Sequence, residues 1–186
     1  MFLTIPTLMT WTRIVAIPLI VGVFYLDIPA VERNLIATVM FVVFAATDWL
    51  DGYLARKLNQ TSSFGAFLDP VADKFLVCAS LLVLVHLQRA DVFVALLIIG
   101  REIAISALRE WMAKAGKSTS VAVSFVGKLK TTAQMVAIVL LLYFQPVAGL
   151  PIATLGTVLI WVAALLTLVS MAYYLVMAAR ALRHTP

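Results

Sequence analysis

The chain has 186 residues, of which 63% are hydrophobic and only 12% are charged, and its mean hydropathy is +1.06. A soluble domain carries about 25% charged residues, so this composition excludes one, and it equally excludes a disordered chain, which needs low hydrophobicity. The single cysteine excludes an internal disulfide framework. We therefore expect one all-α integral membrane domain over residues 1–186, in which the net charge of +5 reflects loop asymmetry rather than a nucleic-acid partner.

Six apolar runs follow one another along the chain, and most are long enough to cross a bilayer. A spanning helix needs about 20 mostly apolar residues, and short polar or Pro- and Gly-containing stretches separate the runs. The runs are continuous rather than alternating, which argues against membrane strands. The expected transmembrane helices are Leu8–Leu26, Leu35–Leu54, Leu68–Leu87, Val92–Trp111, Thr131–Phe144 and Ile152–Met177.

The basic residues are distributed unevenly between the two sides that these six transmembrane helices define. An even number of spans places both termini on one side of the membrane. All 14 Lys and Arg residues except Arg33 and Arg89 then fall on that same side. Because cytoplasmic segments carry the excess of Lys and Arg, we predict that both termini are cytoplasmic.

Four aspartates lie at the cytoplasmic ends of two successive expected helices. Asp48 and Asp51 come near the end of the second helix, and Asp69 and Asp73 come at the start of the third. Their spacings of three and four residues place each pair on one helix face. The connecting loop is short, so we expect antiparallel neighbouring helices whose pairs can face each other. Ionisable residues in such positions are costly and are functional candidates by default.

The chemistry that suits this cluster is the binding of divalent cations next to a phosphate. Carboxylates gathered in a low-dielectric pocket repel one another unless they protonate or bind cations. Oxygen ligands without His or Cys favour Mg²⁺, Mn²⁺ or Ca²⁺ over zinc, and two-metal sites typically clamp a phosphoryl group. Gly52 permits close approach of a ligand to the backbone, and Arg56 is suited to a phosphate oxygen. The alternative from another class is a cation or proton transporter, although its charges are expected near the bilayer midplane.

The residues from Asp48 to Asp73 read D-x2-D-G-x2-A-R-x8-G-x3-D-x3-D. This pattern resembles the signature of the CDP-alcohol phosphatidyltransferases at every fixed position. The resemblance implies a six-helix membrane enzyme that moves a phosphatidyl or phosphoalcohol group from a CDP-linked donor to an alcohol and releases CMP.

The same resemblance implies roles for individual residues. Asp73 would be the general base as well as a metal ligand. Two Mg²⁺ ions per site, or Mn²⁺ in their place, would be coordinated by Asp48, Asp51, Asp69 and Asp73. The CDP-diacylglycerol donor would be bound by Thr7, Thr10, Gly52, Arg56 and Ser62.

Three flanking segments resemble one bacterial branch of the family, whose acceptor is glycerol 3-phosphate. These segments are Ile5–Arg13, Arg101–Trp111 and Gly127–Met135. The resemblance implies a multi-pass homodimer in the bacterial cytoplasmic (inner) membrane, with its active site at the cytoplasmic face and a role in phosphatidylglycerol and cardiolipin synthesis.

A phosphorylated acceptor also needs a cationic pocket of its own. Basic residues at the cytoplasmic ends of the fourth and fifth helices are the candidates, namely Arg101, Arg109, Lys128 and Lys130. Arg101 lies deep in an apolar run, which favours a functional role, and the adjacent Glu102 is a candidate local partner. Positive charge alone does not single out glycerol 3-phosphate, so serine and inositol phosphate remain alternative acceptors.

Overall fold

The computed structural model describes residues 5–58, 63–114 and 125–183, which form six α-helices. Within these helices, the side chains at positions 5–9, 48–58, 63–64, 66, 125–126 and 181–183 lie outside the description. The helices are α1 (Ile5–Val23), α2 (Ala30–Leu58), α3 (Ser63–His86), α4 (Val92–Lys114), α5 (Phe125–Tyr143) and α6 (Ile152–Arg183). The predicted all-helical class is thereby confirmed.

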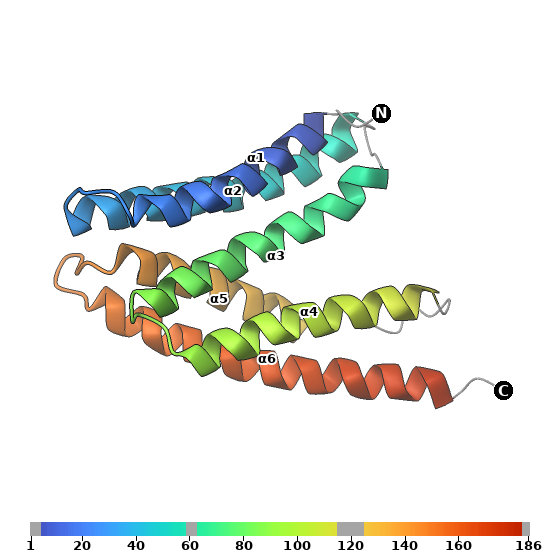
Figure 1. Cartoon of the computed structure of the whole chain (residues 1–186). Helices are drawn as coiled ribbons and strands as arrows, with labels where there is room; N and C mark the ends of the chain where they lie inside the picture. Colours follow the sequence, from blue (N-terminus) through green and yellow to red (C-terminus); the bar gives the residue numbers. More distant parts are fainter. Residues whose placement is uncertain (1–4, 59–62, 115–124, 184–186) are drawn as a thin grey trace.

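The helices run up and down in a bundle, so that α1 begins and α6 ends at the same end of it (Figure 1). Helices α5 and α6 form the most extensive contact, while α1 packs against both α2 and α3. Among the described residues, α3 contacts α1 far more than it contacts α2, with which the sequence predicted a direct pairing. Gly156 lets α6 approach α5 closely, since a Cβ there would lie 2.9 Å from Leu141 Cγ.

Local signals in the sequence set several helix ends. Pro29 and Pro151 immediately precede α2 and α6, at positions where a missing N–H costs nothing. The Asp91 carboxylate accepts a hydrogen bond from the Phe93 amide at 2.7 Å, which caps the start of α4. Gln88 adopts a left-handed conformation with φ of 58° just after α3, as helix C-terminal caps commonly do.

Arg89 holds together the end of the bundle opposite the termini. Its guanidinium donates to the carbonyls of Leu141 and Leu142 at 3.1 and 3.0 Å and to Asn34 Oδ1 at 2.9 Å. Burial, and then the neighbouring Arg33, lower the pKa of Arg89, but an arginine remains charged under such shifts. Arg89 therefore has a structural role at this end, where it links the end of α5 to the start of α2.

The interior is apolar, and so is much of the outer surface. One buried cluster draws side chains from all six helices, including Ile20, Phe41 and Leu84. Large apolar side chains on the outside, such as Phe93 and Leu165, are more than 60% exposed. Among the described residues, two stretches have the length and composition of a membrane span, Ala30–Thr47 and Ile152–Arg180. This exposed apolar surface is what a membrane protein presents to lipid.

Candidate active site

Two carboxylates of α3 are held by two buried side chains of α1. Asp69 and Asp73 lie one helical turn apart, and the Thr10 hydroxyl donates a hydrogen bond to Asp69. Arg13 is fully buried and forms an ion pair with Asp73, and its second terminal nitrogen lies 3.9 Å from Asp69 Oδ1. One guanidinium thus offsets the mutual repulsion of both carboxylates and fixes their orientation.

A second charged cluster joins α4 to α5. Glu102 accepts a hydrogen bond from Arg101 at 3.0 Å and another from Lys130. Arg101 and Lys130 are both buried, and a charge in that position needs a partner to offset its lost hydration. The expectation that Glu102 is a local partner of Arg101 is confirmed, and its contact with Lys130 extends the cluster to a third charge.

Helix α6 supports this cluster through one tyrosine and one serine. The Arg101 and Arg109 guanidinium carbons lie 5.7 and 5.3 Å from the centroid of the Tyr174 ring, within the range of a cation–π contact. Arg109 also donates to the Tyr174 hydroxyl at 3.3 Å, and Arg101 donates to Ser170 Oγ at 3.3 Å. These contacts restrict where the two arginines can point.

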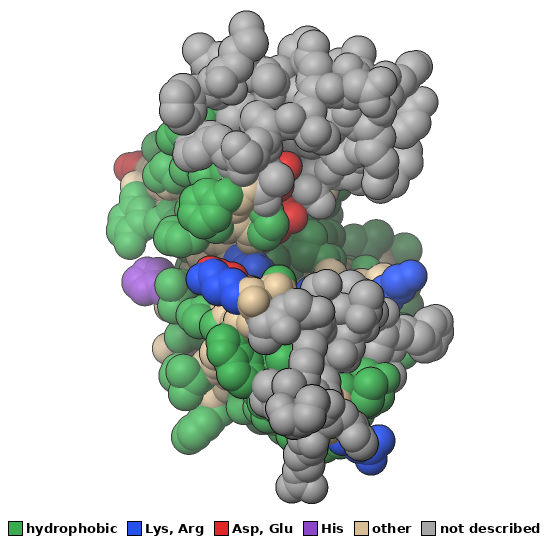
Figure 2. Space-filling view, turned by 90° about the vertical axis from the view of Figure 1, so that its right-hand side faces the viewer, with side chains coloured by type: hydrophobic (Ala, Val, Ile, Leu, Met, Phe, Trp, Pro, Cys, Tyr) green, Lys and Arg blue, Asp and Glu red, His purple; other side chains and the backbone are tan. Residues whose placement is uncertain are grey.

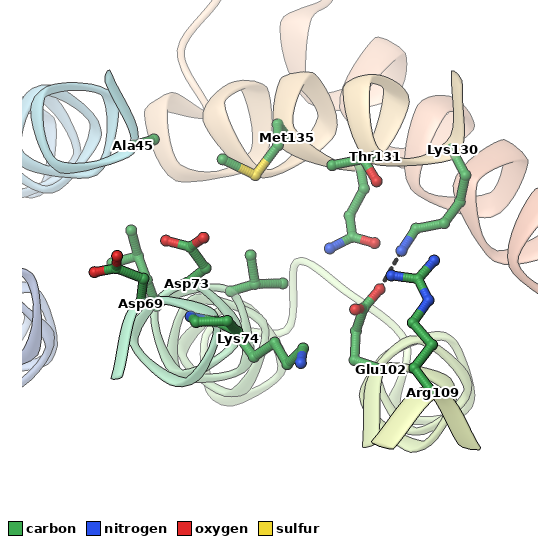
Figure 3. Close-up of a pocket in the computed structure, with 13 residues that line it drawn as sticks. Ala45, Asp69, Asp73, Lys74, Glu102, Arg109, Lys130, Thr131 and Met135 are labelled. Atoms are coloured by element: carbon green, nitrogen blue, oxygen red, sulfur yellow. Dashed lines mark hydrogen bonds and ion pairs between the residues drawn. The ribbon is translucent and has the colours of Figure 1, made fainter. Parts of the chain in front are cut away.

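A cavity of about 410 Å³ connects the two charged clusters, a size that suits a small-molecule site. Figure 3 shows Asp69 and Asp73 on one side of it, with Glu102, Arg109 and Lys130 across the cavity. Seen from the end where α1 begins, the molecular surface is hollowed near its centre, and acidic and basic side chains meet there (Figure 2). Its lining residues are Ala45, Asp69, Pro70, Asp73, Lys74, Leu76, Val77, Glu102, Arg109, Lys130, Thr131, Gln134 and Met135.

The structure describes only part of the predicted metal and donor site. Asp69 and Asp73 lie together at this cavity, and Thr10 contacts Asp69. Ser62 lies outside the described residues. The remaining predicted residues belong to described helices, but the surroundings of these positions are not described. They are Thr7 on α1, and Asp48, Asp51, Gly52 and Arg56 on α2.

The predicted acceptor residues separate into three groups. Arg109 and Lys130 line the cavity. Arg101 is not part of the lining but contacts it through Glu102. Lys128 is exposed and does not line the cavity.

The structure adds site residues that the sequence interpretation did not select. Arg13 was taken only as one of the cytoplasmic charges, although a basic residue within an apolar helix is a signal in its own right. Tyr174 and Gln134 carry no such signal, because single polar residues in an apolar helix are common. Their importance follows from which helices meet at the cavity.

The donor set of the cavity is compatible with a hard divalent cation. Carboxylate oxygen is the ligand type that Mg²⁺ and Mn²⁺ prefer, and α3 contributes Asp69 and Asp73. Among the described side chains, no cluster of three or more His, Cys, Asp or Glu residues is present. The other two predicted metal ligands, Asp48 and Asp51, belong to α2, and their side chains lie outside the description.

Residues 3–169 match the sequence model of the CDP-alcohol phosphatidyltransferase family, whose members generally use a divalent metal ion. The chain belongs to this family, as the aspartate motif predicted. It is 53% identical over 173 residues to the CDP-diacylglycerol–glycerol-3-phosphate 3-phosphatidyltransferases of Shigella flexneri serotype 5b and Salmonella choleraesuis, covering 92% of each chain. It is 54% identical, with the same coverage, to the enzyme of that name from Escherichia coli K12.

Proposed function

We propose that the protein transfers the phosphatidyl group of CDP-diacylglycerol to glycerol 3-phosphate, giving phosphatidylglycerophosphate and CMP. The observation that carries this proposal is the single cavity that joins the paired carboxylates of α3 to the buried cations of α4 and α5. Relatives that match 92% of the chain carry the name of this reaction. Membership of the family leaves the transporter alternative without support.

In this proposal, Asp48, Asp51, Asp69 and Asp73 hold two Mg²⁺ ions, or Mn²⁺ in their place. When bound, such ions supply positive charge at the pyrophosphate of the donor. Thr7, Thr10, Gly52, Arg56 and Ser62 bind the donor. The contact of Thr10 with Asp69 supports a position for α1 beside the pyrophosphate.

Asp73 receives the proton of the attacking alcohol. The 1-hydroxyl oxygen of glycerol 3-phosphate forms a bond to the phosphatidyl phosphorus as the bond from that phosphorus to CMP breaks. The hydroxyl proton moves to the Asp73 carboxylate, and CMP departs with the electron pair of the broken bond. Because an alcohol is a far weaker acid than a carboxylic acid, proton transfer accompanies the attack rather than preceding it. Arg13 orients Asp73 for this step.

The phosphate of the acceptor binds at the cationic side of the cavity. Lys130 and Arg109 line it, and Arg101 lies behind them in contact with Glu102. Glu102 offsets part of the positive charge before the acceptor arrives. A dianionic phosphate monoester is a better match for this cluster than zwitterionic serine, because Glu102 alone does not offset the charges of Arg101, Arg109 and Lys130 and serine has no net charge to offset the remainder.

We further propose six membrane spans with cytoplasmic termini, a homodimer, and a location in the bacterial cytoplasmic membrane. The common end at which α1 begins and α6 ends supports the even number of spans. Arg33 and Arg89, the two basic residues assigned to the outer side, lie at the other end, Arg33 in the first turn of α2 and Arg89 in the connection between α3 and α4. With this topology, the cavity would open at the cytoplasmic face, where soluble glycerol 3-phosphate is available.

An acceptor comparison tests the proposed reaction. Purified protein with CDP-diacylglycerol and Mg²⁺ is expected to release CMP rapidly with glycerol 3-phosphate, and at least about 100-fold more slowly with serine or inositol phosphate, because a polar site rejects a mismatched polar ligand strongly. Chelation by EDTA is expected to abolish release, and added Mg²⁺ to restore it. Faster release with another acceptor would assign the protein to that acceptor instead.

Arg101 provides a test of the acceptor site. Replacing it by alanine is expected to raise the KM for glycerol 3-phosphate by roughly 10- to 100-fold, since a charged hydrogen-bonding group is lost beside Glu102. The KM for CDP-diacylglycerol should change little. Lys114→Ala, which removes an exposed partner of Glu110, is the matched control. Unchanged acceptor kinetics in Arg101→Ala would remove Arg101 from the acceptor site.

A further inference from the structure

Gln134 is a buried polar residue in the wall of the cavity. Its side chain on α5 is only 2% exposed, yet it lines the space between the two charged clusters. Its Oε1 atom has no hydrogen-bond partner among the described residues. Buried polar atoms almost always have a partner in folded proteins, so an amide oxygen left unpaired beside a substrate cavity indicates that the substrate supplies its partner.

The position of Gln134 on α5 suggests which part of a substrate it meets. It lies one helical turn from Lys130, on the same face of α5, and both residues line the cavity. Asp73 lines the side of the cavity that faces Lys130 (Figure 3). An acceptor that places its phosphate at Lys130 and its reacting hydroxyl toward Asp73 must carry its middle carbon past this wall.

In glycerol 3-phosphate, that middle carbon carries the 2-hydroxyl group. The phosphate is matched by cations and the 1-hydroxyl by a carboxylate, so the 2-hydroxyl is the polar group still without a partner. A primary amide pairs with a hydroxyl in either direction, because its oxygen accepts and its nitrogen donates. Gln134 is therefore chemically suited to this group and adds no charge that would disturb the phosphate or the carboxylates.

We infer that Gln134 is a specificity-determining residue that hydrogen-bonds the 2-hydroxyl of the acceptor. This inference rests on the proposed function, since it assumes that glycerol 3-phosphate occupies the cavity. It assigns Gln134 no part in the transfer of the proton or of the phosphatidyl group. Its effect is to favour a polyol phosphate over a phosphate monoester that has only the reacting hydroxyl.

The test compares glycerol 3-phosphate with 3-hydroxypropyl phosphate, which lacks only the 2-hydroxyl. The wild-type protein is expected to prefer glycerol 3-phosphate by roughly 10- to 100-fold in kcat/KM. Gln134→Met, which keeps the length of the side chain without its amide, should lose about that factor with glycerol 3-phosphate and little with the deoxy acceptor. The preference of the variant should therefore fall close to one. Comparing two substrates with two proteins in this way forms a double-mutant-type cycle, which isolates the contribution of the hydrogen bond between Gln134 and the 2-hydroxyl.

Gln145→Met is the matched control, because it makes the same change in the α5–α6 connection at the opposite end of the bundle. Equal losses with both acceptors in Gln134→Met would overturn the inference and leave the proposed function standing. If Gln134→Met failed to fold, the wild-type protein alone would still test the inference. A wild-type kcat/KM ratio near one between glycerol 3-phosphate and the deoxy acceptor would overturn it. Absence of CMP release from the wild-type protein with glycerol 3-phosphate would instead refute the proposed function itself.

Discussion

Replacing Asp73 by asparagine is expected to reduce the turnover of glycerol 3-phosphate by about 100- to 10,000-fold, the usual contribution of a positioned general base. Asparagine keeps the shape of the side chain and can still accept a hydrogen bond from Arg13, and Asp69 still lies 3.9 Å from that guanidinium, so we expect the protein to fold with reduced stability. What is lost is the carboxylate that, in the proposed mechanism, receives the proton and contributes negative charge for the metal ions. CMP release at saturating substrates and Mg²⁺ measures the effect.

The matched control for this substitution is Asp91→Asn. Asp91 is exposed at the start of α4, at the opposite end of the bundle, and asparagine preserves its role as a helix cap. Its turnover should equal that of the wild-type protein. Near-normal turnover in Asp73→Asn would exclude Asp73 as the base, and an equal fall in both variants would point to a general loss of folded protein.

The sequence predicted six helices, and two of their starts to the residue, because local signals mark those two starts. The expected starts at Val92 and Ile152 coincide with those of α4 and α6, since Asp91 and Pro151 mark them. The other four starts, those of α1, α2, α3 and α5, lie three to six residues earlier than expected, and the ends differ by up to six residues. Helix α6 continues to Arg183 and α2 to Leu58, beyond the apolar runs, because Arg and Lys are good helix formers even where the hydrophobic pattern stops.

The start of α5 was misplaced for the same physical reason. The apolar run begins at Thr131, but the helix begins at Phe125 and includes Gly127, Lys128 and Lys130. Charged residues interrupt a hydrophobic pattern without interrupting the backbone hydrogen bonds of a helix. The misplaced start matters for the candidate site, because the additional helical residues include Lys130, which contacts Glu102 at the cavity.

The site itself was only partly predictable. Helical spacing correctly indicated that Asp69 and Asp73 share a face, because that relation depends on one helix alone. The ion pair between Arg13 and Asp73 joins residues 60 positions apart and depends on how α1 packs against α3. Likewise, the contact of Arg109 with Tyr174 depends on where α6 lies against α4. Spacing within a helix does not encode such contacts, so they emerge only from the tertiary arrangement.

The α1–α3 ion pair leads to the second large expected effect, on stability as well as activity. Arg13 is fully buried, pairs with Asp73, and lies 3.9 Å from Asp69. Breaking a buried ion pair costs about 3–5 kcal/mol. For Arg13→Ala we expect the free energy of unfolding to fall by about 3 kcal/mol, the lower end of this range. The loss is at the lower end because 43% of the Asp73 side chain is exposed and can be hydrated when Arg13 is absent. Two adjacent carboxylates would then repel each other without a guanidinium between them.

Thermal unfolding in detergent, measured together with CMP release, tests this role. Arg13→Lys should recover part of the stability, since it restores the charge, but less of the turnover, since a single ammonium group lacks the rigid fork with which the guanidinium directs one nitrogen to Asp73 and another toward Asp69. Lys114→Ala breaks an exposed ion pair with Glu110 and should leave both quantities unchanged. If Arg13→Ala unfolded at the temperature of Lys114→Ala, the pairing of α1 with α3 through Arg13 would not contribute to stability. If Arg13→Lys were fully active, the charge of residue 13 rather than its geometry would position Asp73.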